Sequence, residues 1–82
     1  MQASVEISLY PLNIEYIKYI QEFIENINKN KNLIIETNGM STQIFGDYHE
    51  IMKTLTDEVY NSFQKTGAAV FVFKIVNAFL KQ

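Results

Sequence analysis

The fold of this chain is decided by residues 33–52, LIIETNGMSTQIFGDYHEIM, where two short apolar segments flank an Asn-Gly pair. LIIETN and STQIFG are rich in β-branched and aromatic residues, which is typical of strands. The Asn38-Gly39 pair between them tolerates the positive φ of a tight turn. This pattern predicts two strands, residues 33–38 and 41–46, that form a β-hairpin.

The segment that follows the hairpin carries the signals of a helix start. Asp47 is the expected N-cap, and Glu50 three residues later completes a variant of the capping box. Gly67 is the expected C-terminal stop. Between them, apolar side chains recur at helical spacing at Ile51, Met52, Leu55, Val59 and Phe63. The sequence therefore predicts a second helix directly after the hairpin.

The residues before the hairpin predict one strand and one helix. Residues 2–9, QASVEISL, alternate strictly between apolar and polar side chains, as a half-buried strand does, and Pro11 is expected to end it. From Asn13, the expected N-cap, isoleucines recur at intervals of three and four residues. The predicted apolar stripe, widened by Phe23, consists of Ile14, Ile17, Ile20, Ile24 and Ile27.

The last apolar run completes the order β-α-β-β-α-β. Residues 68–76, AAVFVFKIV, predict a strand that is covered on both faces. With right-handed crossovers, this order gives a four-stranded antiparallel sheet with two helices on one face, the ferredoxin-like α+β fold, as a single domain over residues 1–82. The uncovered sheet face would receive Ser4, Glu6 and Ser8, which suits a ligand pocket or a wet subunit interface.

Composition and charge argue against several classes of partner. The net charge is −2, and all seven basic residues are scattered lysines, which disfavours nucleic acid. The absence of cysteine excludes disulfides and cysteine zinc sites and suits a reducing compartment. No apolar run reaches the length of a membrane span, and residues 1–8 lack the features of a secretion signal. We therefore expect no membrane partner and a cytoplasmic location.

The sequence shows no arrangement of residues that would support catalysis or metal binding. His49, the only histidine, is expected to be a solvated residue on the second helix. The serines lack a neighbouring base, and the glycines lack the spacing of a phosphate-binding loop. Glu6 and Glu36 could form an acid/base pair, although Lys74 as a cross-strand partner of Glu6 is the simpler interpretation. We expect no catalytic residue, no metal site and no enzymatic activity.

The polar residues around the predicted hairpin have two interpretations. Asn38, Ser41, Thr42 and Gln43 offer donors and acceptors beside the soft apolar side chain of Met40, which is the usual composition of a small-molecule pocket. The same residues also serve turns, because Asn-Gly closes hairpins and Ser and Thr cap backbone groups. Spacing alone favours turn chemistry.

Three motifs in order along the chain favour the small-molecule pocket over plain turn chemistry. They are S-x-x-P-L at residues 8–12, M-x-T-x-I-x-G at residues 40–46, and an acidic and apolar helix start at residues 47–51. Together they resemble the small thiamine/hydroxymethylpyrimidine-binding protein family over essentially the whole chain. Members often carry an acidic residue where this chain has Phe45, and a basic residue where it has Val70.

The resemblance implies a ferredoxin-like fold that binds thiamine or hydroxymethylpyrimidine without catalysis and assembles through its sheets into a homodimer or homotetramer. The ligand would be the only small molecule bound, with no further cofactor. The resemblance places Thr42 in the ligand site, so that Thr42 and Ser41 contact the ligand while Ser8, Asn38 and Met40 line the pocket. An aromatic face or a carboxylate for the thiazolium ring would come from Glu6, Tyr10, Glu36 or Phe45.

An alternative function belongs to a different class. The run VNAFL, residues 76–80, extends the apolar character of the last strand, so the open sheet face could instead recognise a protein partner in a regulatory or assembly domain without any metabolite. The last strand is also long, apolar and expected at a sheet edge, where unpaired backbone groups favour association. We therefore expect homo-oligomers through the sheet edge and the sheet face.

Overall fold

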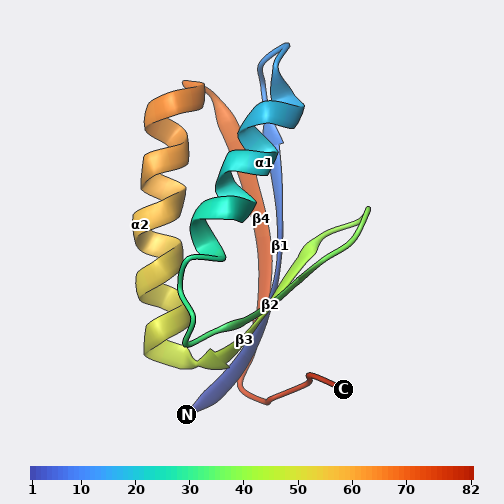
Figure 1. Ribbon diagram of the computed structural model, residues 1–82, viewed down its shortest axis with the longest axis vertical. Helices are drawn as coiled ribbons and strands as arrows, with labels where there is room; N and C mark the ends of the chain where they lie inside the picture. Colours follow the sequence, from blue (N-terminus) through green and yellow to red (C-terminus); the bar gives the residue numbers. More distant parts are fainter.

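Six elements follow one another in the predicted order β1-α1-β2-β3-α2-β4 (Figure 1). The structure, a computed structural model, describes residues 1–82. The element bounds are β1 Gln2–Pro11, α1 Tyr16–Ile27, β2 Ile34–Thr37, β3 Thr42–Asp47, α2 Tyr48–Thr66 and β4 Ala69–Val76.

The four strands form one antiparallel sheet in the order β2-β3-β1-β4, which confirms the ferredoxin-like α+β fold. β1 is the long inner strand: it pairs with β3 from Gln2 to Ile7 and with β4 from Ser4 to Pro11. β2 pairs only with β3, through four residues. The sheet therefore has a short edge at β2 and a long edge at β4.

The helices cover one face of the sheet. The alternation of β1 turns its apolar residues toward α1 and α2, where they join buried side chains of both helices and of β3. Removing one large aliphatic side chain from water contributes about 1.5–3 kcal/mol, so this layer supplies most of the hydrophobic stabilisation. The buried cluster consists of Ala3, Val5, Ile7, Leu9, Phe23, Ile27, Leu33, Ile44, Ile51 and Leu55.

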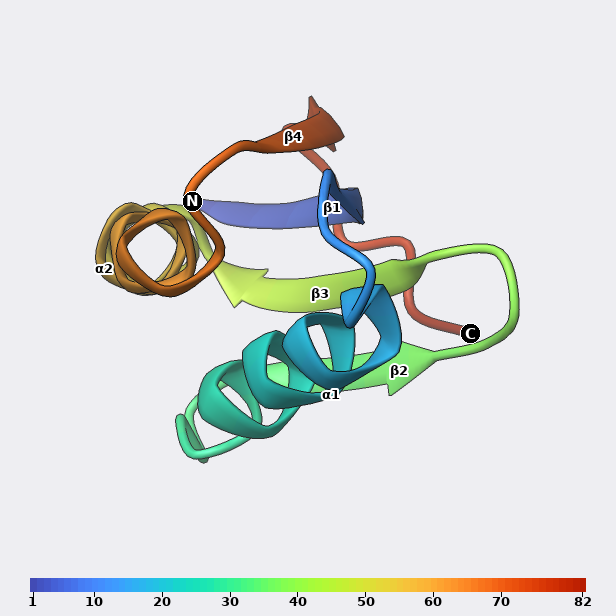
Figure 2. The same cartoon turned by 90° about the horizontal axis from the view of Figure 1, so that it is seen from above.

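The opposite face of the sheet carries no helix. Ser4, Glu6 and Ser8 lie on this open face, as the alternation predicts, and their cross-strand partners lie there with them. Figure 2 shows α2 on one side of the sheet and the segment after β4 on the other. That segment, residues 77–82, crosses the open face, so the face is only partly bare.

The first helix begins later than predicted. Asn13 is not its N-cap: the Asn13 side chain accepts the N–H of Glu15 at 2.8 Å in a turn that precedes the helix. Ile14 therefore lies before the helix and is 96% exposed. Ile17 lies in the first turn of the helix but is also 56% exposed, so neither residue joins the apolar stripe. The predicted apolar stripe packs on the sheet only from Ile20 onward.

The hairpin turn also differs from the prediction. Neither Asn38 nor Gly39 has a positive φ, so the turn does not depend on the left-handed conformation that Asn-Gly favours. Instead, the backbone N–H of Asn38 donates to Ser41 O at 3.1 Å. The Asn38 side chain accepts the N–H groups of Met40 and Ser41 at 2.8 and 3.2 Å. The asparagine closes the turn with its side chain.

The start and the end of the second helix are confirmed. The Asp47 carboxylate accepts the backbone N–H of Glu50 at 3.1 Å, and this hydrogen bond is the largest cause that lowers the pKa of Asp47. Gly67 ends the helix with a φ of 77°, in the left-handed region that glycine adopts at low cost.

Pro11 ends β1, as predicted, although the strand is two residues longer than the predicted range 2–9. Pro11 pairs with Ala69 as the last residue of the strand, and β3 pairs only as far as Ile7, so no ladder on that side of Pro11 requires an N–H donor. One prediction about the strands is wrong. β4 is not covered on both faces in the single chain, because it forms the sheet edge and most of its side chains are exposed. No helix is both long and apolar enough to cross a membrane.

Candidate functional site

A cavity of about 350 Å³ lies between α1, the second half of β1 and the β2–β3 hairpin, past the point where β1 and β3 stop pairing. We call it the hairpin pocket. Its volume falls within the range of pockets that hold small molecules. The polar residues that line it are Ser8, Tyr10, Tyr16, Thr37, Asn38, Ser41 and Thr42. Its apolar residues are Ile7, Leu9, Pro11, Ile20, Phe23, Ile24 and Met40.

The structure brings together all five residues predicted to contact or line a ligand pocket. Ser8 comes from β1, whereas Asn38, Met40, Ser41 and Thr42 come from the hairpin. The antiparallel register of β1 and β3, which places Ile7 opposite Thr42, makes these distant segments neighbours. Tyr10 lines the same pocket from the end of β1.

Two threonine hydroxyls form the polar floor of the pocket. Thr42 is 5% exposed and lies on the helix-facing side of β3, and its Oγ1 is 3.0 Å from Oγ1 of Thr37 on β2. One hydroxyl donates to the other, so the pair keeps one proton and several lone pairs for a further partner. Thr37 was not among the predicted residues. Its position follows from the hairpin register, which pairs it with Thr42.

The Asn38 side chain closes the turn and also leaves a hydrogen-bond donor free for a ligand. Its side-chain oxygen serves the turn, as described above, while its amide nitrogen has no partner within the chain. Such an amide group can donate two hydrogen bonds to a molecule in the pocket. Turn chemistry and ligand chemistry are therefore compatible in this residue.

Ser41 is tied to the open face of the sheet by Glu6. The Ser41 hydroxyl donates to Glu6 Oε2 at 2.9 Å, and Glu6 Oε1 lies 2.9 Å from the ammonium of Lys74. The hydrogen bond from Lys74, followed by that from Ser41, lowers the pKa of Glu6. The predicted cross-strand pair of Glu6 and Lys74 is thus present, and Glu6 holds Ser41 from outside the hairpin pocket.

Glu36 and Phe45 also lie outside the hairpin pocket. Glu36 pairs with Lys81 at 2.8 Å. Phe45 is 5% exposed on the open-face side, with the ring of Phe79 edge-on at 6.1 Å between centroids. Because Glu6 and Glu36 are both engaged elsewhere, no charged side chain lines the hairpin pocket.

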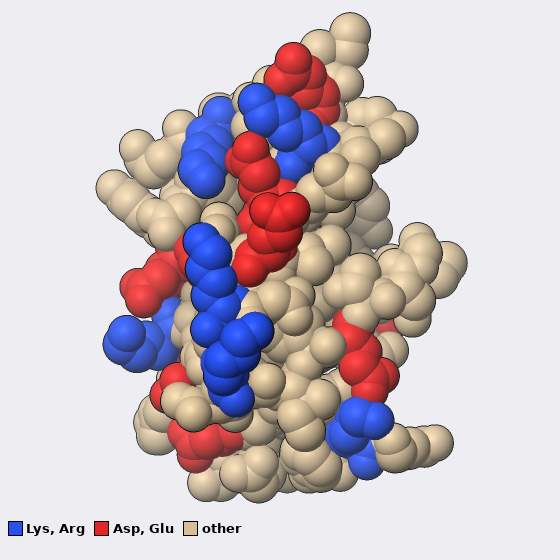
Figure 3. Space-filling model, in the orientation of Figure 1, with Lys and Arg blue, Asp and Glu red and all other residues tan.

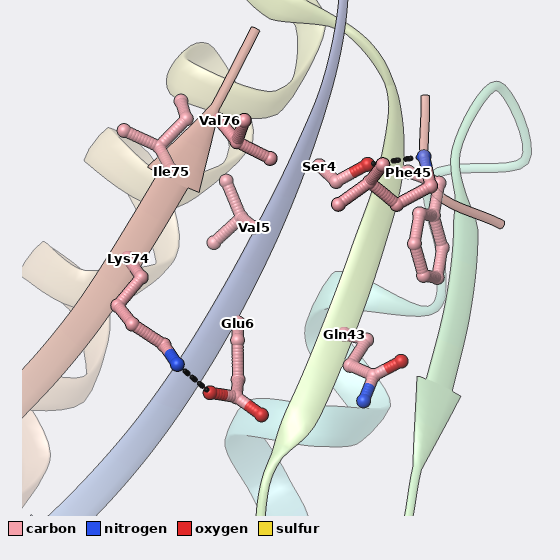
Figure 4. Close-up of a pocket in the computed structure, with 9 residues that line it drawn as sticks. Ser4, Val5, Glu6, Gln43, Phe45, Lys74, Ile75 and Val76 are labelled. Carbon is pink, nitrogen blue, oxygen red and sulfur yellow. Dashed lines mark hydrogen bonds and ion pairs between the residues drawn. The ribbon is translucent and has the colours of Figure 1, made fainter. Parts of the chain in front are cut away.

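A second cavity, of about 380 Å³, lies on the open face (Figure 4). It is lined by β1, β3, β4 and Leu80, and the Glu6–Lys74 ion pair crosses its floor. The two charges neutralise each other there, which leaves Gln43 as the main free polar group. This open-face cavity offers a ligand fewer convergent donors and acceptors than the hairpin pocket does.

The helix α1 supplies the wall of the hairpin pocket that the sequence did not indicate. Tyr16, Ile20, Phe23 and Ile24 face the hairpin across the cavity. Their helical spacing marks them as one stripe, but such a stripe usually packs against a core, so periodicity alone does not separate pocket walls from core residues.

The charged side chains form no large cluster on the face seen in Figure 3. Acidic and basic side chains alternate over it. The projecting hairpin tip at the right of that view carries no charged side chain. His49 is exposed, and no three side chains of His, Cys, Asp or Glu converge.

Solved structures share the whole architecture. A protein of Streptococcus pneumoniae superposes with a TM-score of 0.89 and 21% sequence identity, over 98% of this chain and 90% of that one. A Thermotoga maritima protein, provisionally assigned to thiamine biosynthesis or salvage, has a TM-score of 0.86 and 20% identity, over 95% and 85%. A hypothetical protein of Methanocaldococcus jannaschii has a TM-score of 0.82 and 29% identity, over 99% and 84%.

Sequence comparison assigns the family. No curated protein sequence matches the chain significantly. The profile of the YKOF-related family, however, matches residues 2–77, which include every strand and both helices. The chain therefore belongs to the YKOF-related family.

Proposed function

We propose that the hairpin pocket binds thiamine or its pyrimidine half, hydroxymethylpyrimidine, without chemical conversion. One observation supports the proposal: Ser8, Asn38, Met40, Ser41 and Thr42, the five residues predicted from the sequence to contact or surround a ligand, line one pocket of small-molecule size. Family membership and the provisional assignment of the Thermotoga maritima protein to thiamine biosynthesis or salvage support it.

The chemistry of the pocket suits an aminopyrimidine. Such a ring carries donors and acceptors along one edge, which the free amide of Asn38 and the remaining hydroxyl proton of the Thr37–Thr42 pair can match. Phe23 and Ile20 of α1 offer apolar surface to the faces of the ring.

The uncharged lining also bears on which half of thiamine is recognised. A thiazolium ring is a cation, and both carboxylates that could face it, those of Glu6 and Glu36, are paired with lysines away from the pocket. The exposed rings of Tyr10 and Tyr16 are the remaining groups that attract a cation. We therefore expect hydroxymethylpyrimidine to retain most of the binding free energy of thiamine.

The proposal includes binding without catalysis. The hydroxyls of Ser8 and Thr42 lack a neighbouring base: Ser8 Oγ donates to Met40 O at 3.5 Å, and Thr42 pairs with another hydroxyl. The Ser41 hydroxyl donates to the Glu6 carboxylate, but Glu6 lies outside the pocket and is paired with Lys74. A substrate in the pocket would meet no general acid or base.

Isothermal titration calorimetry with thiamine and with hydroxymethylpyrimidine tests the proposal. We expect saturable heat with both ligands, and none with an apolar ring of similar size such as toluene. Heat equal to dilution for both pyrimidines would overturn the proposal and would favour a protein partner for the open face.

We also propose a cytoplasmic homodimer or homotetramer that uses β4 and the open face of the sheet. The support is physical: β4 is a sheet edge of eight residues with exposed apolar side chains, among them Val70, Val72 and Phe73. Edges of this kind associate unless they are covered. Cytoplasmic conditions suit a chain without cysteine.

A further inference from the structure

The segment after β4 crosses the open face in a defined position. It begins at β1, where the Ser4 hydroxyl, 6% exposed, donates to Ala78 O at 2.7 Å. The same hydroxyl accepts the N–H of Leu80 at 2.9 Å, the bond drawn at Ser4 in Figure 4. A single buried hydroxyl therefore fixes two backbone groups of the segment, and the hydroxyl uses both its donor and an acceptor lone pair in doing so. This is a specific contact and not loose packing.

Beyond β1, residues 77–82 contact the next two strands in order. Phe79 packs edge-on against Phe45 of β3, and Lys81 Nζ lies 2.8 Å from Glu36 Oε1 of β2. The Lys81 side chain is 33% exposed, whereas Lys53, Lys65 and Lys74 in their ion pairs are between 50% and 80% exposed. Lys81 is thus the most sheltered of these lysines.

The contact with β2 reaches the least supported strand of the sheet. β2 is an edge strand of four residues that pairs only with β3, and three of its four residues are exposed. Its last residue, Thr37, contributes to the floor of the hairpin pocket. An ion pair to Glu36 therefore restrains the strand that places Thr37.

We propose that residues 77–82 form a strap that positions the β2–β3 hairpin and thereby sets the shape of the hairpin pocket. Lys81 restrains the β2 side of the hairpin through Glu36, while Ser4 fixes the strap to the inner strand β1. The effect on the hairpin stands on the contacts alone. The effect on affinity rests on the proposed function.

Hydrogen exchange of the hairpin amides tests the strap directly. Asn38 N–H, which donates to Ser41 O, and Ser41 N–H, which donates to Asn38 Oδ1, are suitable reporters. In the variants Lys81→Glu and Glu36→Lys, we expect both amides to exchange about two- to fivefold faster, the range that one exposed ion pair supports. The double variant, which restores the pair with reversed charges, should recover the original rates.

The control variant is Lys53→Glu, because Lys53 also forms an ion pair, with Asp57 at 3.7 Å, but lies on α2 away from the strap. Hairpin exchange should be unchanged in this control. A chain without residues 77–82 should show a larger effect, about tenfold or more, because it loses the Ser4 and Phe79 contacts as well. Amides in the middle of α2 should keep their rates in every charge variant.

Two results would overturn the proposal. One is hairpin exchange that is equal in Lys81→Glu, Glu36→Lys and the unchanged chain. The other is acceleration of all amides together, because that would show global destabilisation. Hydroxymethylpyrimidine affinity should fall in the single variants and recover in the double variant. If the unchanged chain binds no pyrimidine, the proposed function fails, whereas the exchange rates still decide whether the strap holds the hairpin.

Discussion

The hydroxyls of Thr37 and Thr42 share one hydrogen bond in a pocket without charged side chains. Such a pair can orient a ligand through its remaining proton. Thr42→Val keeps the shape of the side chain and removes the hydroxyl. We expect this variant to bind hydroxymethylpyrimidine more weakly by about 0.5–1.5 kcal/mol, which is the loss of one neutral hydrogen bond. Calorimetric titration measures the change.

The matched control is Thr56→Val, on the exposed side of α2. It should leave the affinity unchanged. If Thr42→Val also binds with unchanged affinity and folds normally, the Thr42 hydroxyl serves the hairpin and not the ligand.

Glu6 gives the chain a pH-dependent contact between β1, β4 and the hairpin. The hydrogen bonds from Lys74 and Ser41 lower its pKa below the ordinary value of 4.5, so the carboxylate contributes stability at neutral pH. This contribution is present above the unfolded pKa and is lost as the pH falls through the lower, folded pKa. We expect the stability difference between the unchanged chain and Glu6→Gln to be constant near neutral pH and to shrink below pH 4.5.

Urea unfolding at a series of pH values measures this difference. Glutamine keeps an acceptor for Ser41 but loses the ion pair with Lys74. Parallel pH profiles for the two proteins would contradict the assignment of the lowered pKa to Glu6.

At the residue scale, the sequence predicts contacts that lie within one helical turn or across one strand pair. The Asp47 cap and the Glu6–Lys74 pair are confirmed because capping rules and strand register fix them locally. Lys81–Glu36 was not predicted, since it depends on where an irregular segment crosses the sheet. Local rules do not determine such a path.

At the scale of elements, the start of α1 shows where periodicity fails. The isoleucine spacing extends to Ile14, but the helix begins at Tyr16 and packs on the sheet only from Ile20. Two isoleucines with correct spacing are therefore exposed. Periodicity reports which residues could share a helix face, whereas the length of the sheet beneath decides how many of them are buried.

The loop before β2 approaches β3 closely at Gly46. This glycine is buried with a φ of 157°, and a Cβ atom there would lie 2.7 Å from Leu33 Cδ2. We expect Gly46→Ala to destabilise the fold by about 1–3 kcal/mol, the usual cost of overpacking. Gly39→Ala is the control, because no atom lies within 4 Å of a Cβ at that position and its φ is not positive. Urea unfolding compares the two variants.

Equal stability of the two alanine variants would contradict this prediction. The Leu33 side chain would then move aside without cost, and its close contact with Gly46 would not determine the distance between the Leu33 loop and β3.

The candidate site could be predicted in part at this scale. Met40, Ser41 and Thr42 lie in one motif and Ser8 in another, and the predicted pairing of β1 and β3 makes the two segments neighbours. Asn38 was predicted from its place in the turn. The wall from α1 could not be predicted, since it depends on the angle at which the helix crosses the sheet. Phe23 and Ile27 hold the helix in the core, and the sequence does not show which of the neighbouring side chains then face the hairpin.

At the scale of the whole molecule, a small core leaves much apolar surface exposed. Only 16 of the 82 residues are buried, and β4 exposes apolar side chains on both faces. We expect a partner copy to cover part of this surface, in an interface of about 1,200–2,000 Å². Sedimentation at micromolar concentration should show no dominant monomer. A single species near the chain mass of 9.5 kDa would contradict the expectation.

The fold as a whole was predictable because the order of elements and the right-handed crossovers leave few alternatives. The exposure of β4 was not predictable, because a nearly continuous run of apolar residues is typical of a strand that is buried on both faces. Val72, which is 55% exposed, is an example: its sequence neighbours predict burial, but it pairs with Ser8 and therefore lies on the face that no helix covers.

The strap has a geometric consequence for any second copy that stacks on the open face. Stacked sheets lie about 10 Å apart, a gap that their own side chains fill. Residues 77–82 already occupy this layer over β3 and β2, with Phe79 placed on Phe45. A second copy that stacked on the open face would meet the strap over β3 and β2. We therefore expect such a copy to contact the β4 half of the sheet, with the hairpin of each copy away from the contact.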